Sequence, residues 1–359
     1  MAKKIKEIRN MLVEKEIDAV LIKNSVVKRW MNTLTGSGCQ ILITRNNQYI
    51  ILDGRYVEEA RELEHNLEII LVNPHLNGET HNSAIKRLID EEGLNSLAIE
   101  EDQFTYNQYI EISKLGFEIH LLTNEFPLLR LIKNQDDISI IKEGMEITNT
   151  IYEKVVSHIK LGITENEIAG YIHYYAFKYG AQKMSFDVIV TSGYRTAYPH
   201  GRPTEKKIEI GDPIMIDFGI QYKNYQSDIT RMCFMGQPDE KIVEMYNVCK
   251  EAQQKGIDAI KPGVLASDVD KAARKVIEDA GYGEFFNHGL GHGMGIGEGG
   301  ELPTLNQTCS IILEEGMFMS CEPGIYVPNV GGIRIEDAII IINGVGVPQN
   351  NISKEMRIL

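Results

Sequence analysis

The sequence predicts an α+β protein with two domains and with mixed or antiparallel sheets. Its 359 residues are enough for two domains at roughly 100–200 residues each. Strand-like and helix-like segments do not alternate strictly, which argues against a doubly wound parallel sheet. Pro127 interrupts the pattern before a long helical stretch begins. We therefore expect a boundary at this point, with one domain at 1–126 and a second at 127–359.

The first domain mixes short β-rich runs with amphipathic helices. Apolar runs predict strands at 19–23, 40–44 and 49–53. Asn46 and Asn47 supply a turn between the last two of these strands. Helical spacing predicts two helices, at 54–63 and 79–92, and the second ends before Gly93. The sequence of this domain does not cluster His, Cys and acidic residues at metal-ligand spacing.

The second domain begins with helices and continues into strands and turns. Ile138, Ile141 and Met145 recur at helical spacing. The helices expected in this domain lie at 135–159, 165–179, 239–260 and 267–280. Strands are expected at 186–191, 214–218, 229–235, 318–321 and 333–342. A glycine-rich stretch at 289–300 precedes the last strands.

Composition and charge exclude several classes of protein. Charged residues make up 25% and hydrophobic residues 43% of the chain, which is ordinary globular composition. Acidic residues outnumber basic ones by 51 to 37, and the formal net charge of −14 disfavours nucleic acid and anionic membranes as partners. Apolar runs are too short for a transmembrane helix. Five cysteines without a CxxC pair indicate reduced thiols in a cytoplasmic protein. The N-terminus is charged throughout and lacks the apolar core of a signal peptide.

Two aspartates flank a polar turn and form the first candidate site. If the turn is centred between Tyr222 and Lys223, Asp217 and Asp228 are directly opposed on neighbouring strands. Opposed Cβ atoms lie about 4.5–5.5 Å apart, and two unpaired carboxylates at this spacing repel each other. A cation between them would relieve the repulsion. The alternative is a pair of solvent-exposed strand acids.

Histidine and glutamate candidates follow in two glycine-containing segments. The run HGLGHGMG places His288 and His292 among glycines, which allow close approach of the backbone. Glu322 precedes a Pro-Gly pair, and Glu336 shares a strand face with Arg334. Taken singly, a packed histidine and a solvated salt bridge are the alternatives. Taken together, two Asp, one His and two Glu match an oxygen-rich dinuclear metal site.

These motifs resemble the pita-bread metallopeptidases, in particular the creatinase/prolidase branch. The matching segments follow the family's order and spacing: TSGYRTAYPHGRPT, the two-aspartate hairpin, HGLGHGMG, Glu322-Pro323-Gly324 and GGIRIED. TGSGCQILIT and LDGRY resemble the smaller creatinase-type domain. The resemblance implies a C-terminal pita-bread fold behind an α/β creatinase-type N-terminal domain. It also implies cleavage of the bond before proline, in dipeptides or at a peptide's N-terminus, by a homodimeric enzyme.

Carried over by position, the resemblance assigns roles to individual residues. It implies that two divalent ions are held by Asp217, Asp228, His292, Glu322 and Glu336. Mn²⁺ is the expected metal, with Co²⁺, Fe²⁺ and Zn²⁺ as alternatives. A metal-bridging hydroxide would be the nucleophile, and Glu322 would also shuttle its proton. His200 would stabilise the tetrahedral intermediate, whereas His288 and Arg334 would lie on the substrate side or behind the ligands.

One position departs from the family pattern. Peptidases of this family usually carry a histidine seven residues after the metal-binding one, where it donates a hydrogen bond to the scissile peptide, but here this position is Gly299. Losing one such donor costs on the order of 10²–10³ in rate. Three explanations stay open. Another histidine, His75 or His81 of a dimer partner, replaces the missing one; the substrate is not a normal peptide; or the activity is weak.

Two rival functions stay open. A hydrolase or lyase of the same fold would act on a small C–N compound such as creatine or ectoine, and Gly299 favours this rival. A non-enzymatic binding module is the other, and retention of the full five-ligand set argues against it.

Overall fold

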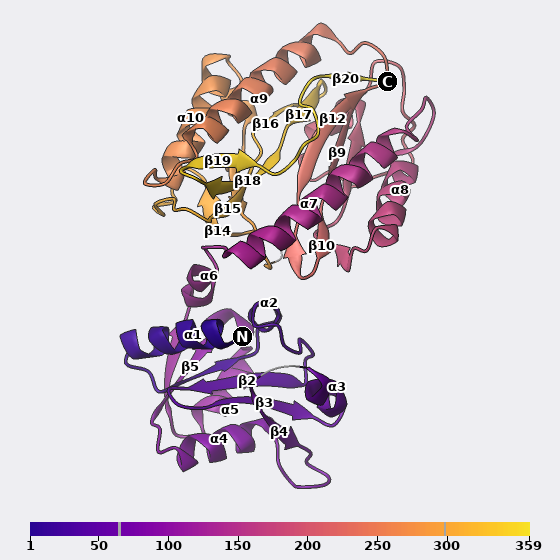
Figure 1. Cartoon of the computed structure of the whole chain (residues 1–359). Helices are drawn as coiled ribbons and strands as arrows, with labels where there is room; N and C mark the ends of the chain where they lie inside the picture. Colours follow the sequence, from indigo (N-terminus) through magenta and orange to yellow (C-terminus); the bar gives the residue numbers. More distant parts are fainter. Residues whose placement is uncertain (64–65, 298) are drawn as a thin grey trace. The chain divides into compact units, whose positions relative to one another are not determined.

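The computed structural model describes residues 1–63, 66–297 and 299–359 and divides into two compact units, Met1–Leu129 and Arg130–Leu359. Each unit contains both helices and strands, which confirms the α+β class (Figure 1). The boundary expected at 126/127 falls inside a short helix, α6 (Glu125–Leu129). Among the described residues, every helix is too short or too polar to cross a bilayer.

The N-terminal unit is built on one six-stranded mixed sheet of order β4-β3-β2-β1-β5-β6. Strand β1 pairs antiparallel with β2 and parallel with β5. The strands are β1 (Ala19–Ile22), β2 (Cys39–Thr44), β3 (Gln48–Asp53), β4 (Glu68–Val72), β5 (Ser96–Glu100) and β6 (Glu118–Leu122). The helices before α6 are α1 (Ala2–Glu14), α2 (Ser25–Trp30), α3 (Val57–Glu62), α4 (His81–Glu91) and α5 (Tyr106–Ser113).

The C-terminal unit holds its strands in several smaller sheets, which include a four-stranded sheet of order β20-β12-β9-β8 and a five-stranded sheet of order β14-β13-β15-β18-β19. Its helices are α7 (Gln135–Val156), α8 (Glu165–Lys178), α9 (Glu240–Ala259) and α10 (Ala266–Asp279). The strands up to residue 234 are β7 (Lys183–Met184), β8 (Ile189–Ser192), β9 (Pro213–Phe218), β10 (Ile220–Tyr222), β11 (Tyr225–Gln226) and β12 (Ile229–Phe234). The later strands are β13 (Gly291–Gly293), β14 (Glu301–Leu305), β15 (Phe318–Cys321), β16 (Gly324–Val327), β17 (Gly331–Arg334), β18 (Asp337–Ile342), β19 (Val345–Pro348) and β20 (Arg357–Ile358).

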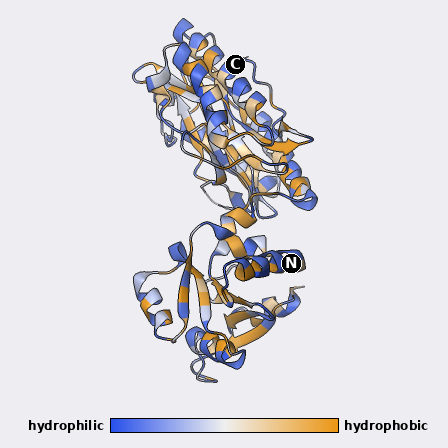
Figure 2. Ribbon diagram, turned by 90° about the vertical axis from the view of Figure 1, so that its left-hand side faces the viewer, coloured by the Kyte–Doolittle hydropathy of each residue, from blue (hydrophilic) through white to orange (hydrophobic). Residues whose placement is uncertain are grey.

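Local sequence explains where the first two helices of this unit begin. Asn134 caps α7 and Thr164 caps α8, each in a reciprocal capping box with the residue three positions later. Both helices bury an apolar face against β8, β9 and β12, whereas α9 and α10 cover the later strands. Figure 2 shows apolar residues along the strands and mixed polarity along the helices. The two helix layers therefore hold the strands from which the site is built.

The hairpin that carries the two aspartates has a different register from the one predicted. Lys223 and Asn224 both have positive φ, at 45° and 73°, and form its two-residue turn. The turn centre is therefore one residue later than expected, and Thr230, not Asp228, lies opposite Asp217. Asp228 is the diagonal neighbour on the same face, just before β12, which still brings the two carboxylates together.

The long strand expected at 333–342 is interrupted. β17 ends at Arg334 and pairs with β16, whereas β18 starts at Asp337 and pairs with β15 and β19. Ile335 and Glu336 lie in the break between two sheets. Even so, Arg334 and Glu336 both line the same cavity, while Ile335 is buried in the apolar core.

Candidate metal centre

Three carboxylates converge where β9, β12 and the β17–β18 break meet. One oxygen each of Asp217, Asp228 and Glu336 lies within 4.8 Å of the others. The three residues are only 6%, 7% and 1% exposed. Burial raises the pKa of all three carboxyls, and for Asp228 and Glu336 the neighbouring carboxylates raise the pKa further, well above its usual range. The cluster is therefore costly unless a cation is bound.

Unsatisfied oxygens in this cluster fit a cation. Oδ1 of Asp217, Oδ1 of Asp228 and Oε1 of Glu336 are buried and have no hydrogen-bond partner in the described part of the chain. Buried polar atoms of folded proteins are normally partnered. Divalent ions such as Mn²⁺ and Mg²⁺ prefer such oxygen ligands. The residues present therefore fit the divalent metal that the sequence predicts.

His292 and Glu322 extend the cluster. His292 Nε2 lies 3.8 Å from Oδ2 of Asp228 and 3.5 Å from Oε1 of Glu322. The other ring nitrogen, Nδ1, lies 3.0 Å from the Gly293 carbonyl oxygen, an arrangement that leaves Nε2 as the ligand atom. Ser320 Oγ donates to Oε1 of Glu322 at 2.9 Å. All the ligands predicted from sequence thus face one another.

Arg334 connects the carboxylates to their surroundings. Its guanidinium is 3% exposed, pairs with Asp217 and donates to Thr230 Oγ1 at 3.2 Å. Thr230 Oγ1 in turn donates to Oε2 of Glu336 at 2.7 Å. Arg334 Nη1 also donates to the Tyr326 hydroxyl at 2.8 Å and to the Pro199 carbonyl at 3.1 Å. Arg334 therefore fixes two carboxylates and does not compete with a metal for their unpartnered oxygens.

Sequence reasoning missed Thr230, Ser320 and Tyr326. A signal existed for two of them, because Thr230 and Ser320 lie two residues from Asp228 and Glu322 and alternate onto the same side of an extended chain. Tyr326 carried no such signal. Its hydroxyl lies 3.0 Å from Nε2 of His288, so it joins His288 to Arg334. Burial lowers the pKa of His288, which favours the neutral imidazole.

All predicted site residues line one cavity of about 890 Å³. They include His200, which is exposed on a loop that follows β8, and His288 behind the ligands. His288 Nε2 lies 3.0 Å from the Tyr326 hydroxyl. Asn287, Thr304, Asn306 and Gln226 add polar groups to the same wall. The cavity has room for a short peptide beside the carboxylates.

The glycine segment provides no side chain where the histidine was expected. Gly299 has a φ of +72°, and a Cβ atom added there would meet nothing within 4 Å. Gly300 is the glycine beside the ligand histidine, since a Cβ added there would lie 3.1 Å from His292 Cγ. His81 Nε2 lies 3.0 Å from the Gly38 carbonyl oxygen, inside the N-terminal unit. Gly299 thus leaves open space in the cavity wall, whereas Gly300 packs closely against the His292 ring.

Gln226, in this wall, leads to a stability prediction. Its side chain is buried, and neither Nε2 nor Oε1 has a partner among the described residues. We expect Gln226→Met to raise the free energy of unfolding by about 1 kcal/mol, because it removes a buried unsatisfied amide. Its cross-strand partner Gln221 is also buried, but Gln221 Nε2 donates to the Asn224 carbonyl at 3.4 Å. Gln221→Met should lower the free energy by about 1 kcal/mol. Urea unfolding measures both, and shifts of the same sign would contradict the assignment.

Comparison with known proteins agrees with this geometry. Residues 139–343 match metallopeptidase family M24, and residues 4–165 match the creatinase/prolidase N-terminal domain. An Xaa-Pro dipeptidase of Pyrococcus horikoshii is 38% identical over 344 residues, which cover 95% of each chain. The uncharacterized peptidase YqhT of Bacillus subtilis is 36% identical over 99% of this chain and 100% of its own.

Solved structures extend the likeness to the whole fold. A crystallised Xaa-Pro dipeptidase from Bacillus anthracis has a TM-score of 0.95 at 37% identity and covers 100% of this chain and 99% of its own. The prolidase of Pyrococcus horikoshii has a TM-score of 0.90 at 36% identity, with 99% of both chains covered. The pita-bread and creatinase-type domains inferred from the motifs are thereby confirmed. The chain belongs to metallopeptidase family M24, whose members use divalent metal ions, and it is a peptidase.

Proposed function

We propose that this peptidase hydrolyses the bond before proline, in dipeptides or at peptide N-termini, with two divalent ions held by Asp217, Asp228, His292, Glu322 and Glu336. The observation that carries the proposal is the set of three buried, unpartnered carboxylate oxygens that face one another in the cavity. Relatives named Xaa-Pro dipeptidase supply the substrate class.

The chain's own residues have separable tasks. Bound metal ions would supply Lewis acidity and lower the pKa of water. Glu322 retains an 18% exposed side chain, and with Oε1 held by Ser320 it can take a proton at Oε2 and pass it to the leaving nitrogen. His200, exposed on the cavity, donates to the substrate oxygen on which charge develops. Arg334 keeps Asp217 and Thr230 in fixed positions.

We propose the metal, assembly and location that the sequence predicts. Four carboxylates and one imidazole suit Mn²⁺, with Co²⁺, Fe²⁺ or Zn²⁺ as alternatives. The free cysteines suit a reducing cytoplasm, and the family resemblance favours a homodimer. Metal analysis of the purified protein tests the metal, and light scattering tests the homodimer.

The decisive experiment measures release of the residue before proline. Chelator-treated protein is loaded separately with Mn²⁺, Co²⁺, Fe²⁺ and Zn²⁺ and given Xaa-Pro dipeptides, Xaa-Pro-Yaa tripeptides and matched Xaa-Ala peptides. We expect metal-dependent hydrolysis of the proline peptides and little release from the alanine controls. Absence of turnover with every metal and every proline peptide would refute the proposal.

A second candidate substrate is a small C–N compound, which the missing side chain at Gly299 favours. Gly299→His separates the two, because a Cβ atom added there meets nothing within 4 Å, although the φ of +72° costs a histidine about 1–2 kcal/mol of backbone strain. We expect the wild-type protein to cleave Xaa-Pro peptides and this variant to change kcat/KM less than about threefold. If instead the wild type hydrolyses proline peptides barely and the variant about 100-fold faster, the chain has a changed substrate or is a decayed peptidase.

A further inference from the structure

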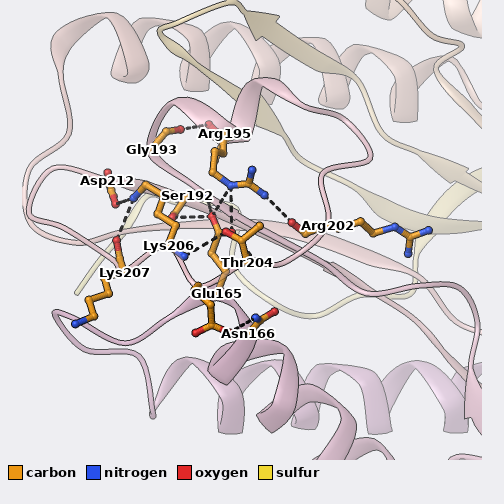
Figure 3. A network of polar contacts seen from close by, with 12 residues as sticks. Glu165, Asn166, Ser192, Gly193, Arg195, Arg202, Thr204, Lys206, Lys207 and Asp212 are labelled. Carbon is orange, nitrogen blue, oxygen red and sulfur yellow. Dashed lines mark hydrogen bonds and ion pairs between the residues drawn. The ribbon is translucent and has the colours of Figure 1, made fainter.

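Glu165 is a completely buried carboxylate that lies outside the metal cluster. It is 0% exposed and accepts hydrogen bonds from the backbone N–H and Oγ of Ser192, at 2.8 and 2.9 Å. Its other oxygen accepts from the backbone N–H and Oγ1 of Thr204, at 3.0 and 2.7 Å. Arg195 Nε lies 3.2 Å from both oxygens. Figure 3 shows these donors converging on the one side chain.

The donors come from both sides of His200. Ser192 and Arg195 precede this histidine, and Thr204 follows it. Arg195 also reaches across the loop, where its Nη2 donates to the Arg202 carbonyl at 2.6 Å (Figure 3). A single carboxylate thus closes the base of the loop that carries His200 into the cavity.

The tip of the loop is held as well. Arg334 Nη1 donates to the carbonyl of Pro199, directly before His200. The Gly201 N–H donates to the Tyr198 carbonyl at 2.9 Å. Gly201 fits closely against β8, since a Cβ atom added there would lie 2.4 Å from Thr191 Cγ2. With base and tip both fixed, the position of the His200 ring follows from the clamp.

A purely helical role for Glu165 does not account for these contacts. As the first residue of α8, an acid here is favoured by the helix dipole. That effect needs no particular partner, and Thr164 and Glu167 already supply the capping box of this helix. The donors of Glu165 instead belong to the loop, from Ser192 to Thr204. A fully buried charge is tolerated only with such a complete set of donors.

We propose that Glu165 is a positioning residue for the proposed peptidase reaction, which sets His200 in the cavity by clamping both ends of its loop. The inference rests on the role proposed for His200. It does not involve the metal ligands, so the Glu165→Gln variant should retain its metal content.

A double-mutant cycle tests this coupling. With Xaa-Pro substrate, Glu165→Gln should lower kcat about tenfold or more, with metal content unchanged, because a misplaced donor stabilises the transition state less. In the His200→Ala background the same change should lower kcat by less than about twofold, since the group it positions is gone. Equal losses in both backgrounds would overturn the inference.

Ile172→Val provides the matched control. Ile172 is buried in the same helix and belongs to its apolar core, so this variant costs stability without touching the clamp. Amide hydrogen exchange over residues 196–202 should rise at least tenfold in Glu165→Gln and stay unchanged in Ile172→Val. Unchanged exchange in Glu165→Gln would overturn the clamp. If Glu165→Gln does not fold, Arg195→Gln, which removes the contact with Arg202, should raise amide hydrogen exchange over residues 196–202 in its place.

The exchange measurement is independent of activity. A wild-type protein without Xaa-Pro hydrolysis would defeat the proposed function, while the exchange difference would still show whether Glu165 holds the His200 loop.

Discussion

Asp228→Asn should reduce metal-dependent Xaa-Pro hydrolysis at least about 100-fold and, at the same time, make the metal-free protein more stable. The first effect follows because this carboxylate lies between the other ligands, with Oδ2 3.8 Å from His292 Nε2 and Oδ1 without a partner. Removing a transition-state electrostatic group of this kind costs on the order of 10²–10³ or more. Activity assays at saturating metal measure it.

The second effect follows from the same burial. Asp228, Asp217 and Glu336 crowd three nearly buried carboxyls together, and their raised pKa values express that cost. Replacing one by a neutral amide relieves repulsion, and we expect a gain of about 1–2 kcal/mol in the free energy of unfolding without metal. Metal at 100 times its Kd stabilises a protein by about 2.7 kcal/mol, and the variant should lose this increment.

A buried aspartate with a partner gives the matched control. Asp270 is 0% exposed, and Arg274 donates to it at 2.8 and 2.9 Å. Asp270→Asn should therefore destabilise the protein both with and without metal, because it leaves a buried cation incompletely paired. If Asp228→Asn also destabilised the metal-free form, the three carboxylates would not be a site held open for cations.

Much of this site was predictable from sequence because its ligands occupy short motifs. Polar residues embedded in strand-like runs, as at Asp217, and glycines around His292 are local signals. The register of the hairpin was not predictable, because the turn centre depends on Lys223 and Asn224 both adopting positive φ. Strand β5, between β1 and β6, was missed because its five residues end in a glutamate and show no alternation.

Contacts between distant segments were the other part that escaped prediction. Arg334 meets Asp217 across 117 positions and Pro199 across 135, and nothing local in the sequence encodes such pairs. The break at Ile335 and Glu336 arises for a similar reason. The chain changes pairing partners there, from β16 to β15, so β17 and β18 belong to different sheets.

Arg334→Met should lower both activity and stability, whereas Asp228→Asn lowers activity alone. We expect activity to fall at least about 100-fold and the free energy of unfolding to fall by about 3–5 kcal/mol, because a buried ion pair loses one partner. Arg334 pairs with Asp217 and also donates to Thr230, Tyr326 and Pro199. Arg334→Lys should recover only part of both losses, since an ammonium cannot reproduce the planar fork.

The double variant Asp217→Asn/Arg334→Met distinguishes a structural ion pair from a role in organising the site. With both charges removed, the stability lost in Arg334→Met should largely return, because no unpaired charge remains in the interior. Activity should not return, since Thr230 and the carbonyl of Pro199 still lack their donor and Asp217 is no longer a ligand. Recovery of stability together with activity would mean that Arg334 only compensates Asp217. Recovery of stability alone would assign the stability loss to the unpaired Asp217 carboxylate. The organising role of Arg334 is then measured by Arg334→Lys, which keeps Asp217 and the positive charge but not the planar fork.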